Sequence, residues 1–166
     1  MAMHFTPTEV VARCVEEYRA AVAQRPELPR YGPYRPRVLL CREIYVAETP
    51  EAARAEGALA LQGFWYVSSL APPPLPGEYS DGRLEALTRR VWGGHTYYSL
   101  EAIGGMVIGS PAEVAAKVDG LEAIGVDTLL LVCSFGNLSH AQVCRSLELF
   151  AEAAIRPRPT VASRPR

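Results

Sequence analysis

Apolar and polar residues follow one another along this chain in blocks that predict helices and strands in alternation. The first block has an apolar face with helical spacing, which predicts a helix over about 7–24 that Thr6 or Thr8 can cap. Further helices are expected over about 50–70, 111–124 and 139–155, and strands over 38–46, 106–108 and 127–133. Such alternation indicates parallel strands joined by crossover helices.

Several of these elements carry signals at their ends. Thr49 can cap the second helix, and Ser139 can cap the last one. Ser110 is followed three residues later by Glu113, which is typical of a capping box, and Gly125 marks the end of that helix. The strand over 127–133 is a continuous apolar run, so we expect it to be buried on both faces.

Segments rich in proline and glycine separate the regular elements. Residues 25–37 and 71–82 are expected to break regular structure, with a short helix over 83–91 and a glycine- and tyrosine-rich loop over 93–105. The proline- and arginine-rich end, 156–166, is predicted to be a disordered tail. The remainder, 1–155, is expected to form a single domain.

Composition narrows the class of protein. The chain has 166 residues, of which 49% are hydrophobic and 21% charged, and its formal net charge is −1. A net charge this close to zero favours binding to neither nucleic acid nor an anionic membrane. The 4 cysteines show no CxxC spacing, the 3 histidines lie far apart, and no apolar run is long enough to span a bilayer. No signal peptide is recognisable, so we expect a cytoplasmic protein with reduced thiols and no metal.

Three stretches of the chain resemble the luciferase-like flavin-dependent monooxygenases. They are RVLLCREIYVAETPEAARAE, VIGSPAEVAAKVDGLEAIGVDTLLL and FGNLSHAQVCRSLELFAEAAI, which together span most of residues 37–155. The first expected helix, which contains Tyr18, looks like the helix that precedes this region in the family. The resemblance implies common descent from a (β/α)8 barrel that oxidises a small organic substrate with reduced FMN and O2.

The resemblance covers only the C-terminal half of a typical family member. The family's N-terminal half supplies the first strands, much of the flavin pocket and a serine-rich segment that binds the FMN phosphate, and residues 1–36 contain nothing similar. A complete barrel needs about 250 residues. We therefore expect an α/β fold: a partial, truncated TIM-barrel-like βα arrangement with an incomplete parallel sheet. Its exposed strand edges predict a homodimer or a companion chain that supplies the missing half barrel.

Ligands of parallel α/β folds bind beyond the C-terminal ends of the strands, which directs attention to three places. Within the first strand, Arg42 and Glu43 point to opposite faces, and Tyr45 lies on the same side as Glu43. The resemblance places Glu43 near the flavin and substrate, as a catalytic general acid or base, with Arg42 and Tyr45 as substrate-binding candidates. The alternative is a structural ion pair on a half-exposed sheet.

The other two places follow the later strands. Gly109 and Ser110 begin a helix whose free N–H groups can hold an anion, so they are the cofactor-binding candidates, with an ordinary helix cap as the alternative. The loop after the last strand would line the mouth of the pocket. Its substrate-binding candidates are Ser134, Phe135 and Asn137. His140 could bind a substrate carboxylate or serve as a catalytic acid or base, whereas the alternative for this segment is helix capping and loop closure.

Two functions fit this sequence. The first is a truncated luciferase-like monooxygenase homologue that oxidises a small organic substrate, with a role in secondary metabolism. The second is a flavin-free descendant that binds a small molecule, catalyses a non-redox step or serves as a partner subunit. Because the family's phosphate anchor is absent, the chain alone is predicted to bind FMN weakly or not at all.

Overall fold

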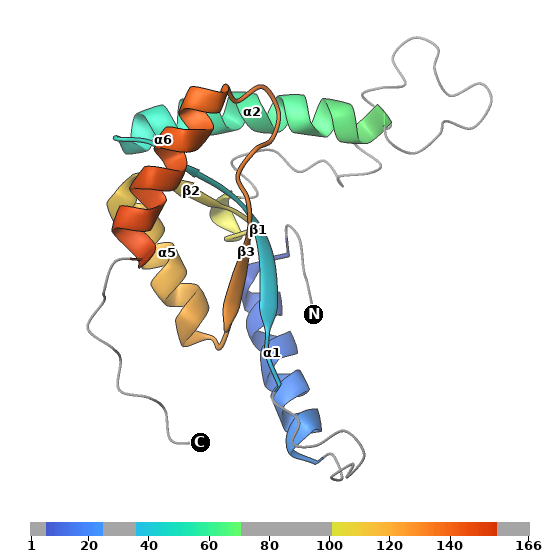
Figure 1. Ribbon diagram of the computed structural model, residues 1–166. Coiled ribbons are helices and arrows are strands. Elements are labelled where there is room, and N and C mark those ends of the chain that lie inside the picture. Colours follow the sequence, from blue (N-terminus) through green and yellow to red (C-terminus); the bar gives the residue numbers. More distant parts are fainter. Residues whose placement is uncertain (1–5, 25–35, 71–100, 156–166) are drawn as a thin grey trace, which may run out of the picture.

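The computed structural model describes residues 6–24, 36–70 and 101–155. In chain order, their elements are α1 (Thr8–Ala23), β1 (Leu39–Val46), α2 (Pro50–Leu70), β2 (Val107–Gly109), α5 (Pro111–Ala123), β3 (Thr128–Val132), α6 (His140–Phe150) and the π-helix η2 (Ala151–Ile155). Figure 1 labels all of these except η2. The three strands form one open parallel sheet, which confirms the expected α/β fold with an incomplete parallel sheet. The short helix expected at 83–91 and the tail at 156–166 lie outside the described residues.

The sheet has the order β2-β1-β3, so the first strand in the chain is the central one. Its two neighbours are staggered along it. β3 pairs with the first part of β1, from Leu39 opposite Thr128 to Glu43 opposite Val132. β2 pairs with the last part of β1, up to Val46 opposite Gly109. The C-terminal end of β1 therefore extends past the end of β3.

This overhang leaves β1 backbone groups that β3 cannot satisfy. A buried N–H group without an acceptor is costly, so a side chain must take the place of the missing strand. Ser146 of α6 does so, because its Oγ accepts a hydrogen bond of 2.8 Å from the N–H of Val46. The Ser146 side chain is only 2% exposed. Helix α6 is thereby fixed against the end of the central strand.

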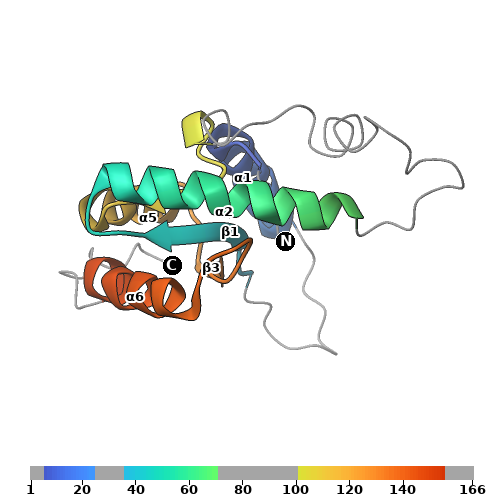
Figure 2. The ribbon, with the colours of Figure 1, turned by 90° about the horizontal axis from the view of Figure 1, so that it is seen from above.

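Helices cover both faces of β1, and Figure 2 shows α2 on one side of the strand and α6 on the other. Alternate β1 residues enter two different hydrophobic clusters, as expected for a pleated strand. One cluster joins β1 to α1, α5 and α6 through Val11, Val15, Leu40, Ile44, Val46, Val114, Leu121, Leu149 and Phe150. The other joins β1 and β2 to α2 through Tyr45, Ala53, Ala60, Leu61, Ile108 and Phe135. None of the described helices combines the length and apolarity needed to cross a membrane.

Burial of β3 differs from the prediction. The strand exists as expected, but the expectation that both of its faces are buried is wrong, because its residues are partly exposed and Leu130 is 40% exposed. β3 is an edge strand, and within the described residues Val132 is its one member that joins the cluster against α2. Among the described residues, no side chain from the first part of β3 packs into the cluster against α2.

Helix ends mostly follow the sequence signals. Ser110 and Glu113 form the predicted capping box, and Gly125 ends α5 with a φ of 98°, a backbone conformation that favours glycine. The Oγ1 of Thr49 accepts a 3.2 Å hydrogen bond from the N–H of Ala52 at the start of α2.

The start of α1 does not follow the prediction. Neither Thr6 nor Thr8 caps it, because Pro7 stands at the N-cap position and no side chain hydrogen-bonds there. The Thr8 hydroxyl instead donates to the carbonyl of Gly104 over 3.1 Å, and the Thr8 N–H donates to the carbonyl of Ile103 over 2.9 Å. The threonine therefore joins α1 to the segment that leads into β2.

Candidate functional site

Three polar side chains meet at the C-terminal end of β1, where parallel α/β folds bind their ligands. The Tyr45 hydroxyl donates a hydrogen bond to Glu56 Oε2 of α2. Gln142 Nε2, from the first turn of α6, donates to the same oxygen over 2.9 Å. Two consecutive elements, β1 and α2, and the distant helix α6 therefore contribute one hydrogen-bonded group.

The surroundings of this group favour a neutral phenol. Tyr45 is only 2% exposed, and burial raises its pKa, with the hydrogen bond to the Glu56 carboxylate and the charge of that carboxylate acting in the same direction. Glu56 is half-buried. The arrangement can therefore hold a proton on Tyr45 while Glu56 offers a carboxylate to a further donor.

Gln142 is itself held in place by the end of α6. Its Oε1 accepts from the N–H of Ser139 over 3.0 Å and from the Ser139 hydroxyl over 2.9 Å, which is the second half of a capping box. Its amide nitrogen therefore points to Glu56 because its oxygen is already engaged. The side chain that completes the group is fixed by helix capping.

The sequence prediction found Tyr45 but missed its two partners. The Ser-x-x-Gln pattern at 139–142 was a readable capping signal, so the fixed orientation of Gln142 was open to prediction. Glu56 stands in an alanine-rich helix and carries no local signal that it faces a strand. Its role depends on how α2 crosses β1, which only the tertiary structure supplies.

Arg42 and Glu43 lie deeper in the molecule, and both side chains are fully buried. Alternation places Glu43 on the Tyr45 side of β1 and Arg42 on the other side. Arg42 Nη2 donates to the carbonyl of Thr6 over 2.6 Å, and Nη1 donates to the carbonyl of Cys41 over 3.2 Å. Burial lowers the pKa of Arg42, and the charge of Glu43 opposes that shift. Arg42 thus contacts backbone carbonyls in the interior, at the start of α1.

The loop after β3 brings one of its candidate residues to the site. Phe135 is 5% exposed and packs in the same cluster as Tyr45, whereas Ser134 and Asn137 are exposed. Gly136 has a φ of 60°, and a Cβ there would lie 1.7 Å from the carbonyl oxygen of Ala60. The loop therefore packs backbone to backbone on α2, which requires glycine and directs Phe135 inward.

His140 does not join the Tyr45 group. It is exposed at the first position of α6, where the sulfur of Cys144 lies 3.5 Å from its Nε2. Of the predicted catalytic pair, the structure thus places Glu43 in the interior and His140 on the surface.

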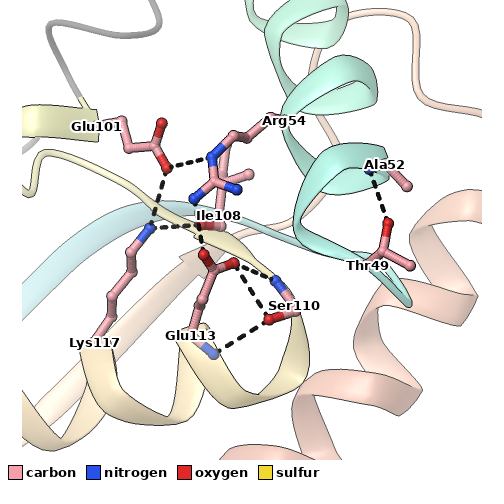
Figure 3. Close-up of polar contacts among 8 residues, drawn as sticks. All are labelled: Thr49, Ala52, Arg54, Glu101, Ile108, Ser110, Glu113 and Lys117. Carbon is pink, nitrogen blue, oxygen red and sulfur yellow. Dashed lines mark hydrogen bonds and ion pairs between the residues drawn. The ribbon is translucent and has the colours of Figure 1, made fainter.

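The start of α5 is already occupied by a carboxylate. Glu113 Oε2 accepts a 2.9 Å hydrogen bond from the N–H of Ser110, and a Cβ on Gly109 would lie 2.8 Å from the same oxygen. The Ser110 N–H, and then Arg54, lower the pKa of Glu113, although burial opposes them. Figure 3 shows this carboxylate between Ser110 and Arg54.

The cations beside this helix terminus are paired as well. Arg54 contacts Glu101 at 3.2 Å and Glu113 at 2.8 Å, and Lys117 Nζ donates to the carbonyl of Ile108 over 2.6 Å (Figure 3). Burial lowers the pKa of Lys117, while the charge of Glu101 opposes that shift. A phosphate here would have to displace Glu113 and disrupt these ion pairs. The residues around Gly109 and Ser110 therefore do not fit the phosphate of FMN.

Comparison with known proteins reveals similarity of fold. No family profile matches the chain, and no curated protein does. Among solved structures, the monooxygenase RslO1 from Streptomyces bottropensis is similar over 93% of this chain, with a TM-score of 0.62 and 20% sequence identity. This chain spans 40% of the length of RslO1. The similarity indicates a shared fold over almost the whole of this chain and less than half of the neighbour.

Proposed function

We propose that this chain supplies the C-terminal half of a luciferase-like oxidative enzyme that acts on a small organic substrate. The observation that carries the proposal is the hydrogen-bonded group of Tyr45, Glu56 and Gln142 at the C-terminal end of the central strand. This is where ligands of parallel α/β folds bind. The fold similarity to part of a monooxygenase also supports the proposal of an oxidative enzyme.

The chemistry of the group suits a substrate with a hydroxyl or carbonyl. Glu56 is half-buried, so it can accept a hydrogen bond from a substrate hydroxyl, and Gln142 supplies a fixed amide beside it. Phe135, in the same cluster as Tyr45, adds an apolar wall. Proton transfer to Glu56 from a bound substrate hydroxyl is the step that these residues can perform.

The residues that bind the FMN phosphate in such an enzyme must come from another chain. The described residues offer no unpaired cation at the start of α5, and Glu113 occupies that terminus. Each charge-assisted hydrogen bond to a phosphate contributes roughly 1.5–3 kcal/mol, so missing even two lowers affinity about a hundredfold or more. We propose that a second copy or a companion chain provides the anchor.

The same observation favours a second candidate, a flavin-free descendant that uses the Tyr45 group to bind a small molecule. In that case neither the isoalloxazine ring nor the phosphate has a site. The two candidates differ in whether the ring alone is recognised, which is open to measurement.

Fluorescence titration of the purified chain with riboflavin and with FMN distinguishes them. A ring site without a phosphate anchor binds both ligands weakly and within about twofold of each other, and Tyr45→Phe weakens both. Tyr18→Phe, on α1 and against the other hydrophobic cluster, is the matched control and should leave binding unchanged. No binding of either ligand supports the flavin-free candidate. Much tighter binding of FMN than of riboflavin by the monomeric chain would refute the missing anchor, whereas the same result for a homodimer would mean that the second copy supplies it.

A further inference from the structure

Helix α6 presents an imidazole and a thiol side by side on the surface. His140 and Cys144 are four residues apart and both exposed, so they lie on one face of the helix. The Cys144 sulfur is 3.5 Å from Nε2 and 3.9 Å from Nδ1 of His140. Neither side chain takes part in the Tyr45 group.

That spacing matches one edge of a tetrahedral zinc site. A Zn–S bond of about 2.3 Å and a Zn–N bond of about 2.0–2.1 Å, at the tetrahedral angle, hold sulfur and nitrogen about 3.6 Å apart. A thiolate and a neutral imidazole are also the ligand types that zinc prefers. A zinc ion can therefore bind both side chains with little change in rotamer.

Two ligands leave half of the coordination shell open. Among the described residues, no group of three or more His, Cys, Asp or Glu side chains is placed to hold a metal ion. Zinc would complete its shell with further ligands, and a second copy of this chain carries the same pair. Two copies related by a twofold axis give a Cys2His2 shell that carries no net charge.

The surface around the pair suits contact between two copies. Leu147, one turn beyond Cys144, is one of the exposed large hydrophobic residues, at 37%. Arg145 is paired with Glu48 and Glu148, so the positive charge next to the ligands is offset. The exposed leucine beside the ligand pair therefore offers an apolar contact to a second α6.

We propose that His140 and Cys144 form half of a zinc site that joins two copies of this chain through α6. Each copy contributes one thiolate and one imidazole, and one zinc ion is bound per two chains. The proposal does not depend on the proposed function, because it uses no residue of the Tyr45 group.

The test is a zinc titration of the reduced, metal-free protein by calorimetry, with light scattering in parallel and Co²⁺ as a spectroscopic substitute. We expect half an equivalent of zinc per chain, absorption bands of tetrahedral Co²⁺ bound to thiolate, and zinc-dependent association that a chelator reverses. His140→Gln and Cys144→Ser should each weaken zinc binding by more than the 10–100-fold typical of losing an outer-shell partner. Cys14→Ser is the matched control, because Cys14 lies on α1.

The outcomes separate a metal site from a simple hydrogen bond between thiol and imidazole. Equal zinc affinity in the parent protein and in both ligand variants would overturn the proposal. One zinc per chain without association would overturn the role of the second copy. Because both ligand positions are exposed, circular dichroism should confirm that the variants remain folded.

Discussion

Strand β1 carries two adjacent charged residues, Arg42 and Glu43, and both are fully buried. Strand β3 is apolar apart from its first residue, Thr128, yet its Leu130 is 40% exposed. The two strands are hydrogen-bonded neighbours in one sheet. Burial here follows position, since β1 lies between two strands and has helices on both faces, while β3 forms an edge. If hydrophobicity alone decided burial, the apolar strand β3 would be more buried than the charged strand β1.

The two strands therefore differ in what their stability requires. Buried charges in β1 require compensation, which for Arg42 comes from two backbone carbonyls and from the charge of Glu43. The exposed apolar edge of β3 needs cover, which in most proteins comes from another strand, a helix or a second subunit. Changes in β1 should therefore affect stability most, and changes in β3 should affect association.

The largest effect is expected from removing one of the buried charges. Arg42→Met removes a buried charge, its hydrogen bonds to the carbonyls of Thr6 and Cys41 and its attraction to Glu43, which should lower the free energy of unfolding by about 3–5 kcal/mol. Urea denaturation followed by circular dichroism measures the loss. The double variant Arg42→Met, Glu43→Gln removes both charges and should recover part of the stability. Additive losses would show that the two side chains are not coupled.

A leucine pair tests the comparison between the strands directly. Leu40→Ala in β1, where the side chain is 1% exposed, should lower the free energy of unfolding by about 2–5 kcal/mol. Leu130→Ala in β3 should cost less than about 1 kcal/mol, because the side chain is already 40% exposed. If the cost of Leu130→Ala rises with protein concentration, a second chain covers β3. Similar losses at low concentration would contradict the comparison.

The overhang of β1 beyond β3 predicts a smaller loss at Ser146. Ser146→Ala removes the acceptor for the N–H of Val46 in a buried setting, so the free energy of unfolding should fall by about 1–3 kcal/mol. Ser134→Ala, at an exposed position, should change it by less than about 0.5 kcal/mol. Equal effects of the two serine changes would mean that water replaces the Ser146 hydroxyl.

The sequence predicted the elements well because their signals are local. Capping residues such as Ser110 with Glu113, the stop at Gly125 and the apolar runs of the strands all act within one turn or one strand. The alternation of strands and helices was enough to expect a parallel sheet. The start of α1 shows where such local signals fail, since Pro7 stands at the N-cap position and no side chain caps the helix.

What the sequence did not supply depends on tertiary position. The central place of β1 buries Arg42 and Glu43, and the edge position of β3 exposes Leu130, but strand order is not encoded in either strand alone. The same holds for the candidate site. Glu56 belongs to it only because α2 crosses the face of β1 that carries Tyr45.

The smallest expected effect concerns the ionisation of Tyr45. Burial and Glu56 raise the pKa of Tyr45 above its ordinary value of about 10. The neutral phenol is therefore favoured by folding, and its stabilising contribution is complete below about pH 10 and is lost as the pH rises further. Spectrophotometric titration of the 8 tyrosines should include at least one that ionises only when the protein unfolds in alkali.

Two variants assign that tyrosine. Tyr45→Phe should remove the late-ionising group and make the stability fall less steeply above pH 10, because the group linked to the loss is gone. Glu56→Gln removes the negative charge that raises the pKa and should move the late ionisation to lower pH, while burial keeps the pKa above the ordinary tyrosine value. Ionisation of Tyr45 near the ordinary tyrosine pKa of about 10 would show that this end of β1 is open to water. That result would reduce the contrast between the buried central strand and the exposed edge.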